Sequence, residues 1–382
     1  MTKNVLIATD NFLPRWDGVS RFLNEVIPGI AEDYDVTVIA PDYGEVDADG
    51  YDLIKISLSR YSIGDYTLPS LFNSEVKEEV QKADIIFAQT IGPIGSNAIR
   101  KGAKYDKNVV SYIHNIEWEL IPLATGNAIA KKYLGWLIKL YARYHYNKCD
   151  KLIIPAKIIG RKLEWYGVET DKVTAQLGVN TNVFNPLKEK SEEEQKRIEE
   201  RKDELGLNDE IIIGTHGRLA REKDIKTLLR SFKWLKKKRS DVKLVIIGDG
   251  LEEISSMIQE EDGAIWIPRS DTVQRELSLM DIYVTCSLTE TTSLSTLEAM
   301  STGLAVVSTP VGYVKEYIRD GYNGLTFDFK DSYELYQNIK LLCDDDKKRR
   351  LYGKRARKKV MEEFRWDRTT EKIKKALKDL NK

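Results

Sequence analysis

Two glutamates frame a run of small hydroxyl residues in the segment ETTSLSTLEAM, which extends from Glu290 to Met300. Ser295 followed three residues later by Glu298 is typical of a capping box, in which the two side chains satisfy backbone N–H groups at a helix start. This structural interpretation accounts for Glu298 but leaves Glu290 unexplained. No basic residue lies within the segment to neutralise either acid.

Two cations follow an apolar run in the second half of the chain. The run IIIG leads into THGRLAREKD, which places Arg218 and Lys223 in a loop just before an amphipathic helix. Fixed positive charges at a helix N-terminus suit a phosphate or diphosphate, because backbone N–H groups and the helix dipole add to the side-chain charges. A solvated basic surface loop would have the same composition, so both interpretations stay open.

Three further positions lie where apolar runs end. His114 follows VVSYI, although a lone histidine is more often a hydrogen-bonded structural residue. Gly18 opens a helix in DNFLPRWDGVSRF, where backbone N–H groups could approach an anion, and a plain loop-to-helix turn explains it nearly as well. The glycines of GDG, residues 248–250, indicate a tight turn, because Glu253 replaces the third glycine of a dinucleotide-binding fingerprint.

Composition excludes several classes of function. Sixty Lys and Arg residues balance sixty Asp and Glu residues, so there is no global basic field for nucleic acid, and an anionic ligand must meet a local cluster. No apolar run is long enough to cross a bilayer, and no signal-peptide pattern is present, so we expect a cytoplasmic protein. His114, His145 and His216 have no metal-ligand spacing, and the three cysteines are isolated. We therefore expect no metal site.

Short apolar runs bounded by turn or helical segments recur along the whole chain. Runs that are apolar on both faces are typical of parallel strands covered by helices. They occupy residues 5–8, 36–40, 84–88, 109–113, 151–155, 211–214, 243–248, 264–267, 282–286 and 305–309. Between them, five residues have the spacing of one buried helix face: Ile225, Leu228, Leu229, Phe232 and Leu235.

Two successive β-α arrays in 382 residues predict an α/β protein with two doubly wound domains. We place the boundary at about residue 185, near the charged and poorly periodic stretch KEKSEEEQKRIEERKDEL. Ligands of open parallel sheets bind beyond the carboxyl ends of the strands, so the cleft between the domains is the expected site.

Several segments together resemble the family-4 retaining glycosyltransferases of the GT-B fold (glycosyltransferase group 1). They are Glu290-x7-Glu298 with AMSTGLAVV, GRLAREKD, KLVIIGDG, the Gly18 loop, His114 after a strand, and LGVNTNVFNP. The resemblance covers nearly the full length. It implies two Rossmann-like domains with a cleft between them, namely an acceptor-side domain at residues 1–185 and a nucleotide-sugar-binding domain at 186–364. A C-terminal helix at 365–382 would pack back on the first domain.

By that resemblance, the protein would move a hexose from a nucleotide-diphosphate sugar to a lipid or glycan acceptor, with retained anomeric configuration and without a metal or other cofactor. Arg218 and Lys223 would neutralise the diphosphate, and His114 would approach the sugar from the first domain. Glu290 would contact the sugar ring, and Glu298 would hold the ribose hydroxyls. The backbone of residues 266–269 would border the base. The further donor-binding positions are Gly18, Arg269, Thr292, Ser293 and Leu294.

The same resemblance implies a binding role for the two acids. Glu290 would lie on the loop before a helix and Glu298 in its first turn, where carboxylates can accept paired hydrogen bonds from vicinal hydroxyls without a neutralising cation. Two positions depart from the family. Ser293 stands where many relatives have glycine, and Asp17 precedes Gly18, where an acid beside a diphosphate is unfavourable unless turned away.

The acceptor is less clearly indicated. Residues 128–148 mix Lys and Arg with aromatic residues at helical spacing, as in a helix that lies on an anionic membrane. We favour instead a face packed against the chain's own sheet, formed by Leu137, Leu140, Tyr141 and Tyr144. A lipid acceptor and a peripheral contact with the cytoplasmic membrane face stay open. So do two other functions, namely a sugar-nucleotide epimerase of the same architecture and a nucleotide-sugar-binding protein without catalysis.

Overall fold

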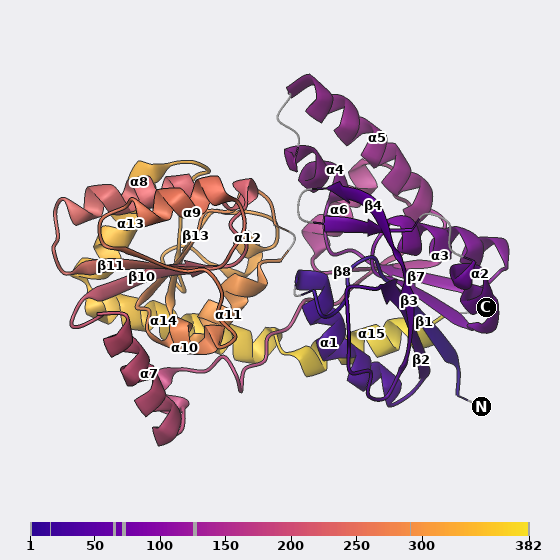
Figure 1. Cartoon of the computed structure of the whole chain (residues 1–382), viewed down its shortest axis with the longest axis horizontal. Helices are drawn as coiled ribbons and strands as arrows, with labels where there is room; N and C mark the ends of the chain where they lie inside the picture. The colour runs from indigo at the N-terminus through magenta and orange to yellow at the C-terminus, as the bar shows by residue number, and fades with distance from the viewer. Residues whose placement is uncertain are drawn as a thin grey trace. The chain divides into compact units, whose positions relative to one another are not determined.

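The computed structural model describes residues 2–15, 17–63, 66–70, 74–124, 128–290 and 292–380. The chain divides into two compact units (Figure 1). Unit 1 is Met1–Leu177 together with Trp366–Lys382, and unit 2 is Gly178–Arg365. Each unit has a core sheet of parallel strands, as the apolar runs predict.

The core sheet of unit 1 has the strand order β3-β2-β1-β6-β7-β8-β9. Its strands are β1 (Asn4–Ala8), β2 (Asp35–Pro41), β3 (Asp52–Ile56), β6 (Ile85–Ala88), β7 (Asn108–Tyr112), β8 (Lys151–Ile154) and β9 (Lys172–Thr174). An antiparallel pair, β4 (Leu58–Ile63) and β5 (Tyr66–Pro69), lies outside this sheet. The α-helices of the unit are α1 (Gly18–Ala31), α2 (Glu75–Lys82), α3 (Pro93–Lys104), α4 (Glu117–Leu120), α5 (Ala128–Tyr146), α6 (Lys157–Trp165) and α15 (Trp366–Lys378), and a 3₁₀ helix, η1 (Ile121–Ala124), follows α4.

The core sheet of unit 2 has the order β12-β11-β10-β13-β14-β15. Its strands are β10 (Ile211–His216), β11 (Val242–Ile247), β12 (Ala264–Ile267), β13 (Ile282–Thr285), β14 (Ala305–Ser308) and β15 (Leu325–Thr326). Its α-helices are α7 (Glu192–Glu204), α8 (Ile225–Lys236), α9 (Glu252–Gln259), α10 (Val273–Ser278), α11 (Leu294–Thr302), α12 (Val314–Tyr317), α13 (Ser332–Asp344) and α14 (Asp346–Glu363). Two 3₁₀ helices are η2 (Leu187–Glu189) and η3 (Arg221–Lys223). Helices cover both faces of this sheet, with α8 and α13 on one side and α11 and α14 on the other (Figure 1).

Burial explains why these segments form parallel strands. In β1, Val5, Leu6, Ile7 and Ala8 are all buried, so both faces of the strand pack against helices. The predicted apolar face of α8 is also confirmed, because every one of its five residues is buried in the core of unit 2.

The strand order reverses between β1 and β6 in unit 1 and between β10 and β13 in unit 2. Loops that leave two neighbouring strands in opposite directions at such a switch point open a crevice beyond the carboxyl ends of the strands. Each doubly wound unit therefore has one edge at which the chain topology favours ligand binding.

The boundary between the units corrects the expected one. It lies between Leu177 and Gly178, before the expected position at residue 185. The segment that follows bonds to unit 2, because Val179 N–H donates to Phe364 O (2.9 Å) and Phe184 O accepts from Arg357 Nη1 (3.2 Å). The charged stretch near residue 190 is the helix α7, in which only Ile198 is buried, and this explains its weak apolar periodicity.

The C-terminal helix α15 packs within unit 1. It contacts α1, where the rings of Trp366 and Phe22 lie 6.1 Å apart, and Lys374 Nζ lies 2.7 Å from Asp33 Oδ2. Ile373 and Leu377 are fully buried. The chain therefore crosses from unit 2 back to unit 1 at its last helix.

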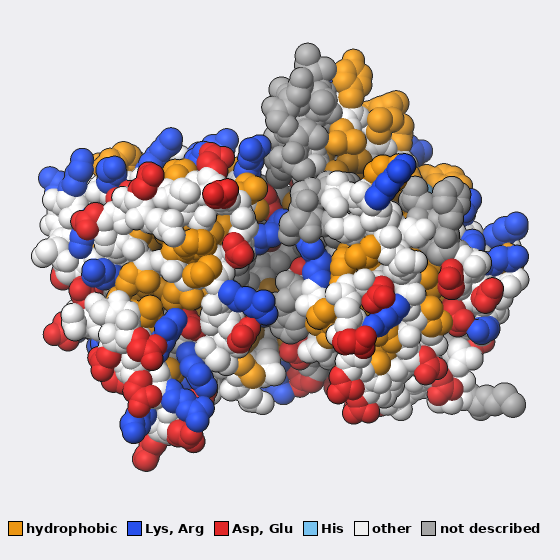
Figure 2. Space-filling model, viewed as in Figure 1, with side chains coloured by type: hydrophobic (Ala, Val, Ile, Leu, Met, Phe, Trp, Pro, Cys, Tyr) orange, Lys and Arg blue, Asp and Glu red, His pale blue; other side chains and the backbone are white. Residues whose placement is uncertain are grey.

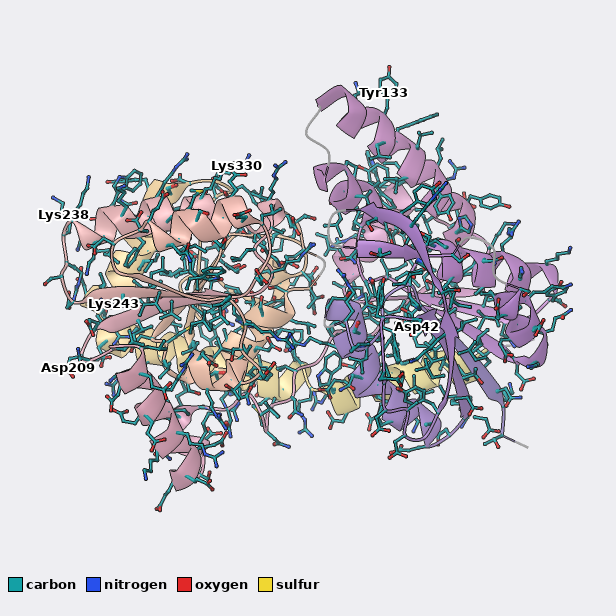
Figure 3. The ribbon with its side chains drawn as sticks, viewed as in Figure 1. Asp42, Tyr133, Asp209, Lys238, Lys243 and Lys330 are labelled. Atoms are coloured by element: carbon teal, nitrogen blue, oxygen red, sulfur yellow. The ribbon has the colours of Figure 1, made fainter. Side chains whose placement is uncertain are left out.

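The structure corrects the favoured interpretation of residues 128–148, in which four side chains of this segment pack against the sheet. Leu137, Leu140, Tyr141 and Tyr144 do not pack against the sheet, because each is between 44% and 55% exposed. The packed face consists instead of Ala142, His145 and Tyr146. Apolar side chains gather along α5 in Figure 2. Tyr133, near the N-terminal end of this helix, points outward in Figure 3.

Candidate functional site

A small pocket opens at the switch point of unit 2. It lies at the carboxyl ends of β10 and β13, and polar residues from the loops after both strands line it together with the strand ends. The polar and charged lining residues are Thr215, His216, Arg218, Lys223, Thr285, Ser287 and Ser295. Both predicted cations, Arg218 and Lys223, therefore border the place that the sheet topology favours for a ligand.

Glu290 meets Lys223 at this pocket. Glu290 lies on the loop between β13 and α11, as expected, and its Oε1 forms an ion pair with Lys223 Nζ and accepts a hydrogen bond from Ser287 Oγ (3.0 Å). The two loops are also joined through the backbone, because Leu288 N–H donates to Glu222 O (2.7 Å). Burial alone would lower the pKa of Lys223, but the charge of Glu290 and the hydrogen bond to it outweigh burial and raise that pKa.

Glu298 meets His216, the last residue of β10. The distance from His216 Nε2 to Glu298 Oε2 is 2.7 Å, and the two side chains are 6% and 1% exposed. The two acids thus have basic neighbours from outside their segment, Lys223 and His216.

The capping box predicted for Ser295 and Glu298 is wrong. The N-cap of α11 is Ser293, whose side chain accepts from Thr296 N–H (3.4 Å), so Glu298 falls beyond the first turn of α11. The glutamate therefore does not cap the helix but points its carboxylate to His216. The serine that departs from the family pattern supplies the cap that a glycine could not supply through a side chain.

Arg218 also borders the pocket, and its side chain is more exposed than that of Lys223. Its side chain is about half exposed, and Nη2 donates to Glu222 Oε1 (2.6 Å). A guanidinium group has five N–H donors, and this bond uses one of them.

The remaining donor-binding positions predicted in unit 2 differ in burial and in their place in the fold. Thr292 and Ser293 are buried beside the start of α11, and Leu294 is its first residue and half-buried. Arg269 follows β12 at the sheet edge, where its side chain is 87% exposed and its Nε lies 3.5 Å from Asp271 Oδ1. Arg269 does not line the pocket, and the structure gives no contact between it and the other predicted residues of the described chain.

The predicted tight turn at residues 248–250 holds the loops after β10 and β11 together. Gly248 has φ of +137°, and a Cβ atom added there would lie 1.9 Å from Gly217 O. Leu219 N–H donates to Asp249 O, and Leu251 N–H donates to Leu219 O, both at 2.8 Å. Glycine is thus required by backbone contact with the loop that carries Arg218.

His114 lies in unit 1 and is buried. Its Nε2 is 3.0 Å from Gln89 Oε1, and its ring packs on the rings of Phe22 and Tyr112, with centroid distances of 4.8 and 4.6 Å. Burial lowers the pKa of His114 to about 3, so the imidazole is neutral at physiological pH. A buried histidine with an amide partner fits the structural interpretation, and its predicted role toward the sugar stays a prediction.

Gly18 opens α1, but the N–H groups that follow it already have an acceptor. The N-cap residue Asp17 accepts through Oδ1 from Val19 N–H (2.9 Å) and Ser20 N–H (3.0 Å). The acid that departs from the family pattern therefore fills the anion position at this helix start itself. This corrects the prediction that these amides are open to an anion.

Among the residues that the structure describes, no group of three or more His, Cys, Asp or Glu side chains is arranged to hold a metal ion. Within the same residues, no helix combines the length and the apolar character needed to span a bilayer.

The chain matches two family models, which together cover both units. "Glycosyltransferase Family 4" matches residues 16–182, and "Glycosyl transferases group 1" matches residues 196–359. The chain belongs to the group 1 glycosyltransferases. Its fold is GT-B, with two Rossmann-like domains.

Similar proteins agree with this family membership. The glycosyltransferase is 27% identical over 263 residues to the alpha-monoglucosyldiacylglycerol synthase of Streptococcus pneumoniae, a match that covers 66% of this chain and 57% of the relative. It is 26% identical over 265 residues to the N-acetyl-alpha-D-glucosaminyl L-malate synthase of Bacillus anthracis, covering 64% of this chain and 69% of the relative. The first match thus spans little more than half of the relative's own length.

A solved structure has the same fold over the whole glycosyltransferase chain. HepE of Anabaena in complex with UDP-glucose superimposes with a TM-score of 0.76 at 16% identity, covering 99% of this chain and 100% of that one. At this identity the likeness concerns the fold.

Among the polar pocket residues that sequence reasoning missed, two contact the predicted acids. His216 was considered only as a metal ligand, and Ser287 was not considered at all, although both contact a predicted acid. A signal for His216 was present, because it precedes Gly217 at the end of the apolar run that leads to Arg218. Its partner Glu298 is 82 residues away, a pairing that spacing alone does not reveal.

Proposed function

We propose that this glycosyltransferase moves a hexose from a nucleotide-diphosphate sugar to a lipid or glycan acceptor, with retention of the anomeric configuration and without a metal ion. The observation that carries this proposal is the arrangement at the switch point of unit 2, where Arg218 and Lys223 line one pocket and Lys223 contacts Glu290. Two cations and two acids at one strand edge suit a ligand that is both anionic and rich in hydroxyl groups.

The cations are assigned to the diphosphate. An ammonium group has three N–H donors, so the bond from Lys223 to Glu290 leaves two donors for phosphate oxygens. As the bond between the anomeric carbon and the diphosphate oxygen breaks, negative charge grows on the leaving group, and preorganised donors stabilise that change. Hydrogen bonds to charged groups contribute roughly 1.5 to 3 kcal/mol each, so Arg218 and Lys223 together supply several kcal/mol of the barrier reduction.

The acids are assigned to the hydroxyl groups of the donor. Lys223 and Ser287 both bond to Oε1 of Glu290, which orients the carboxylate, and we assign Oε2 to a hydroxyl of the sugar. Glu298 is assigned to the ribose. The acceptor oxygen bonds to the anomeric carbon on the face from which the diphosphate leaves, and the acceptor proton passes to the departing diphosphate.

A donor screen followed by product analysis tests the proposal. UDP-glucose, UDP-N-acetylglucosamine and GDP-mannose are added separately, and the expected result is that one of them raises the melting temperature, because it binds the native form. With that donor, transfer should require an acceptor, and the product should keep the anomeric configuration of the donor by NMR. Isomerised sugar formed without any acceptor would support the epimerase, and binding without turnover would support the non-catalytic protein.

The metal-free part of the proposal has its own test. Arg218 and Lys223 are expected to carry the charge that a divalent cation carries in metal-dependent enzymes. Excess EDTA should therefore leave the transfer rate nearly unchanged. Complete loss of activity, restored by added Mg²⁺ or Mn²⁺, would contradict it.

The proposed lipid acceptor rests on the outer face of α5. Trp136, Leu137 and Leu140 are exposed there, and Arg143 and Lys148 border a shallow hollow beside them. Aromatic and basic residues on one exposed helix face suit an interface with anionic lipid.

Vesicle sedimentation tests this surface. Vesicles with anionic phosphatidylglycerol should bind the protein at low salt, and a variant with Trp136→Ser and Leu140→Ser should bind less, because both side chains lose apolar contact with lipid. Equal binding of the two proteins, or none by the wild type, would favour a soluble glycan acceptor.

A further inference from the structure

His216 joins β10 to α11 at the pocket of unit 2. Its Nε2 lies 2.7 Å from Glu298 Oε2, and both side chains are almost completely buried. We propose that His216 is a positioning residue for nucleotide-sugar binding, which fixes the Glu298 carboxylate in the orientation that accepts the two ribose hydroxyls. This inference rests on the proposed function, because it gives Glu298 the ribose as its ligand.

The chemistry of the contact sets the direction of the hydrogen bond. When the Glu298 carboxylate is ionised it only accepts hydrogen bonds, and the imidazole then carries its proton on Nε2 and donates it to Glu298. A buried carboxylate is costly unless it is paired, and this donor offsets part of that cost. His216 therefore holds one oxygen of Glu298 in place through a hydrogen bond.

Both partners are held by regular structure. His216 is the last residue of β10 and is paired with Ile247 of β11, and its ring packs edge-on against the ring of Tyr283 with centroids 5.4 Å apart. Glu298 lies on α11, where its carbonyl oxygen accepts from Thr302 Oγ1 (2.9 Å). Side chains locked by packing on a strand and a helix hold a functional carboxylate within a narrower range than loop residues would.

This geometry also determines which oxygen of the Glu298 carboxylate bonds to His216. His216 occupies Oε2 of Glu298, while a carboxylate has about four acceptor sites on its two oxygens. We assign the ribose hydroxyls to this carboxylate, whose orientation the imidazole helps to set. Loss of the donor would remove one hydrogen bond that orients the carboxylate, and ribose binding would then have to restore that order.

The test compares two substitutions that separate packing from hydrogen bonding. His216→Phe keeps an aromatic ring against Tyr283 but removes the donor, whereas His216→Gln keeps an N–H donor of similar reach. The donor sugar identified by the screen is titrated into each full-length variant, and kcat and donor KM are measured for transfer. His216→Leu replaces the phenylalanine variant if that variant does not fold, as judged by its melting temperature.

The expected result is a rise in donor KM of roughly ten- to a hundredfold for His216→Phe with a small change in kcat, and recovery of most of the affinity in His216→Gln. Because His216 acts through Glu298, His216→Phe should change KM far less when Glu298→Gln is already present. An unchanged KM in folded His216→Phe, or equal effects of His216→Phe with and without Glu298→Gln, would overturn the inference while the proposed function stands. If the wild type bound no nucleotide sugar at all, the proposed function and this inference would both fall.

Discussion

Each acid at the pocket of unit 2 is held by a nitrogen from the end of β10 or the loop that follows it. Lys223 bonds to Glu290 and His216 to Glu298, and both partners of each pair are at least partly buried. In water such pairs contribute little, but away from water a charge without a partner is costly. The two contacts therefore orient the acids in a chain whose charges balance overall.

The buried histidine of unit 1 predicts a dependence of stability on pH. The pKa of His114 is 6.5 in an unfolded chain and about 3 in the folded one, so between these values the unfolded state binds a proton that the folded state does not. Stability should fall as the pH falls through this window, by at most about 1.4 kcal/mol per unit. Urea unfolding of wild type and His114→Gln at pH 6.5 and 5 measures this, because the advantage of the wild type should shrink at pH 5.

A carboxyl group of the same unit provides the contrasting control. Burial raises the pKa of Glu117 to about 7, above its unfolded value of 4.5, although the hydrogen bond from Tyr146 acts against burial. Its contribution to stability is present below pH 4.5 and is lost as the pH rises through 7. Glu117→Gln should therefore change the pH slope in the opposite sense to His114→Gln. A difference between wild type and His114→Gln that is the same at both pH values would contradict the assignment.

At the scale of elements, the pocket depends on two loops that touch through their backbones. The loop after β10 carries Arg218, and the loop after β11 supports it through Gly248 and Gly250. Neither glycine contributes a side chain, yet a Cβ atom at either position would overlap a carbonyl oxygen.

Gly248→Ala should therefore destabilise the protein strongly. Its φ of +137° is unfavourable for alanine, and the added carbon would lie 1.9 Å from Gly217 O. We expect a loss of about 2 kcal/mol or more in the free energy of unfolding. Gly18→Ala is the matched control, because no atom lies within 4 Å of its added carbon, and denaturant unfolding should show little change. Equal stability of the two variants would contradict the close contact of the loops.

The helix start at α11 gives a second prediction for an element. Ser293 accepts from Thr296 N–H, so Ser293→Ala should cost about 1 kcal/mol of stability. Ser295→Ala should cost less, because Ser295 is the second residue of the helix and does not cap it. Thermal unfolding of the two variants decides between the observed cap and the capping box that the sequence indicated. A larger loss of stability for Ser295→Ala than for Ser293→Ala would instead support the capping box.

The apolar pattern predicted every core-sheet strand that has a neighbour on both sides, together with one edge strand, β12. β1, β10 and β13 have neighbours on both sides and form continuous apolar runs. The missed strands of the core sheets, β3, β9 and β15, are sheet edges, where one side of the strand has no strand beside it, and the separate pair β4 and β5 was missed as well. Their residues are partly exposed and mixed in type, so the sequence carries little signal for them.

At the scale of the molecule, the sequence indicated that Arg218 and Lys223 lie near one strand end but not which residues they contact. The order of apolar runs indicated two wound sheets, and Arg218 and Lys223 follow the strand at which the second sheet reverses. The Lys223–Glu290 pair joins residues 67 apart, and the exposure of Leu137 and Tyr144 depends on how α5 packs. Such facts come from tertiary packing, which local spacing does not encode.

The measurement that tests the account most directly compares two lysines near the start of α8. Lys223 lines the pocket, whereas Lys226 forms an exposed ion pair with Glu253. For transfer from the donor found by the screen, Lys223→Ala should lower kcat/KM by about a hundredfold or more, because the leaving diphosphate loses a fixed positive charge. Lys226→Ala should transfer sugar at the wild-type rate. Near-normal transfer by a folded Lys223→Ala would contradict the claim that this pocket holds the diphosphate.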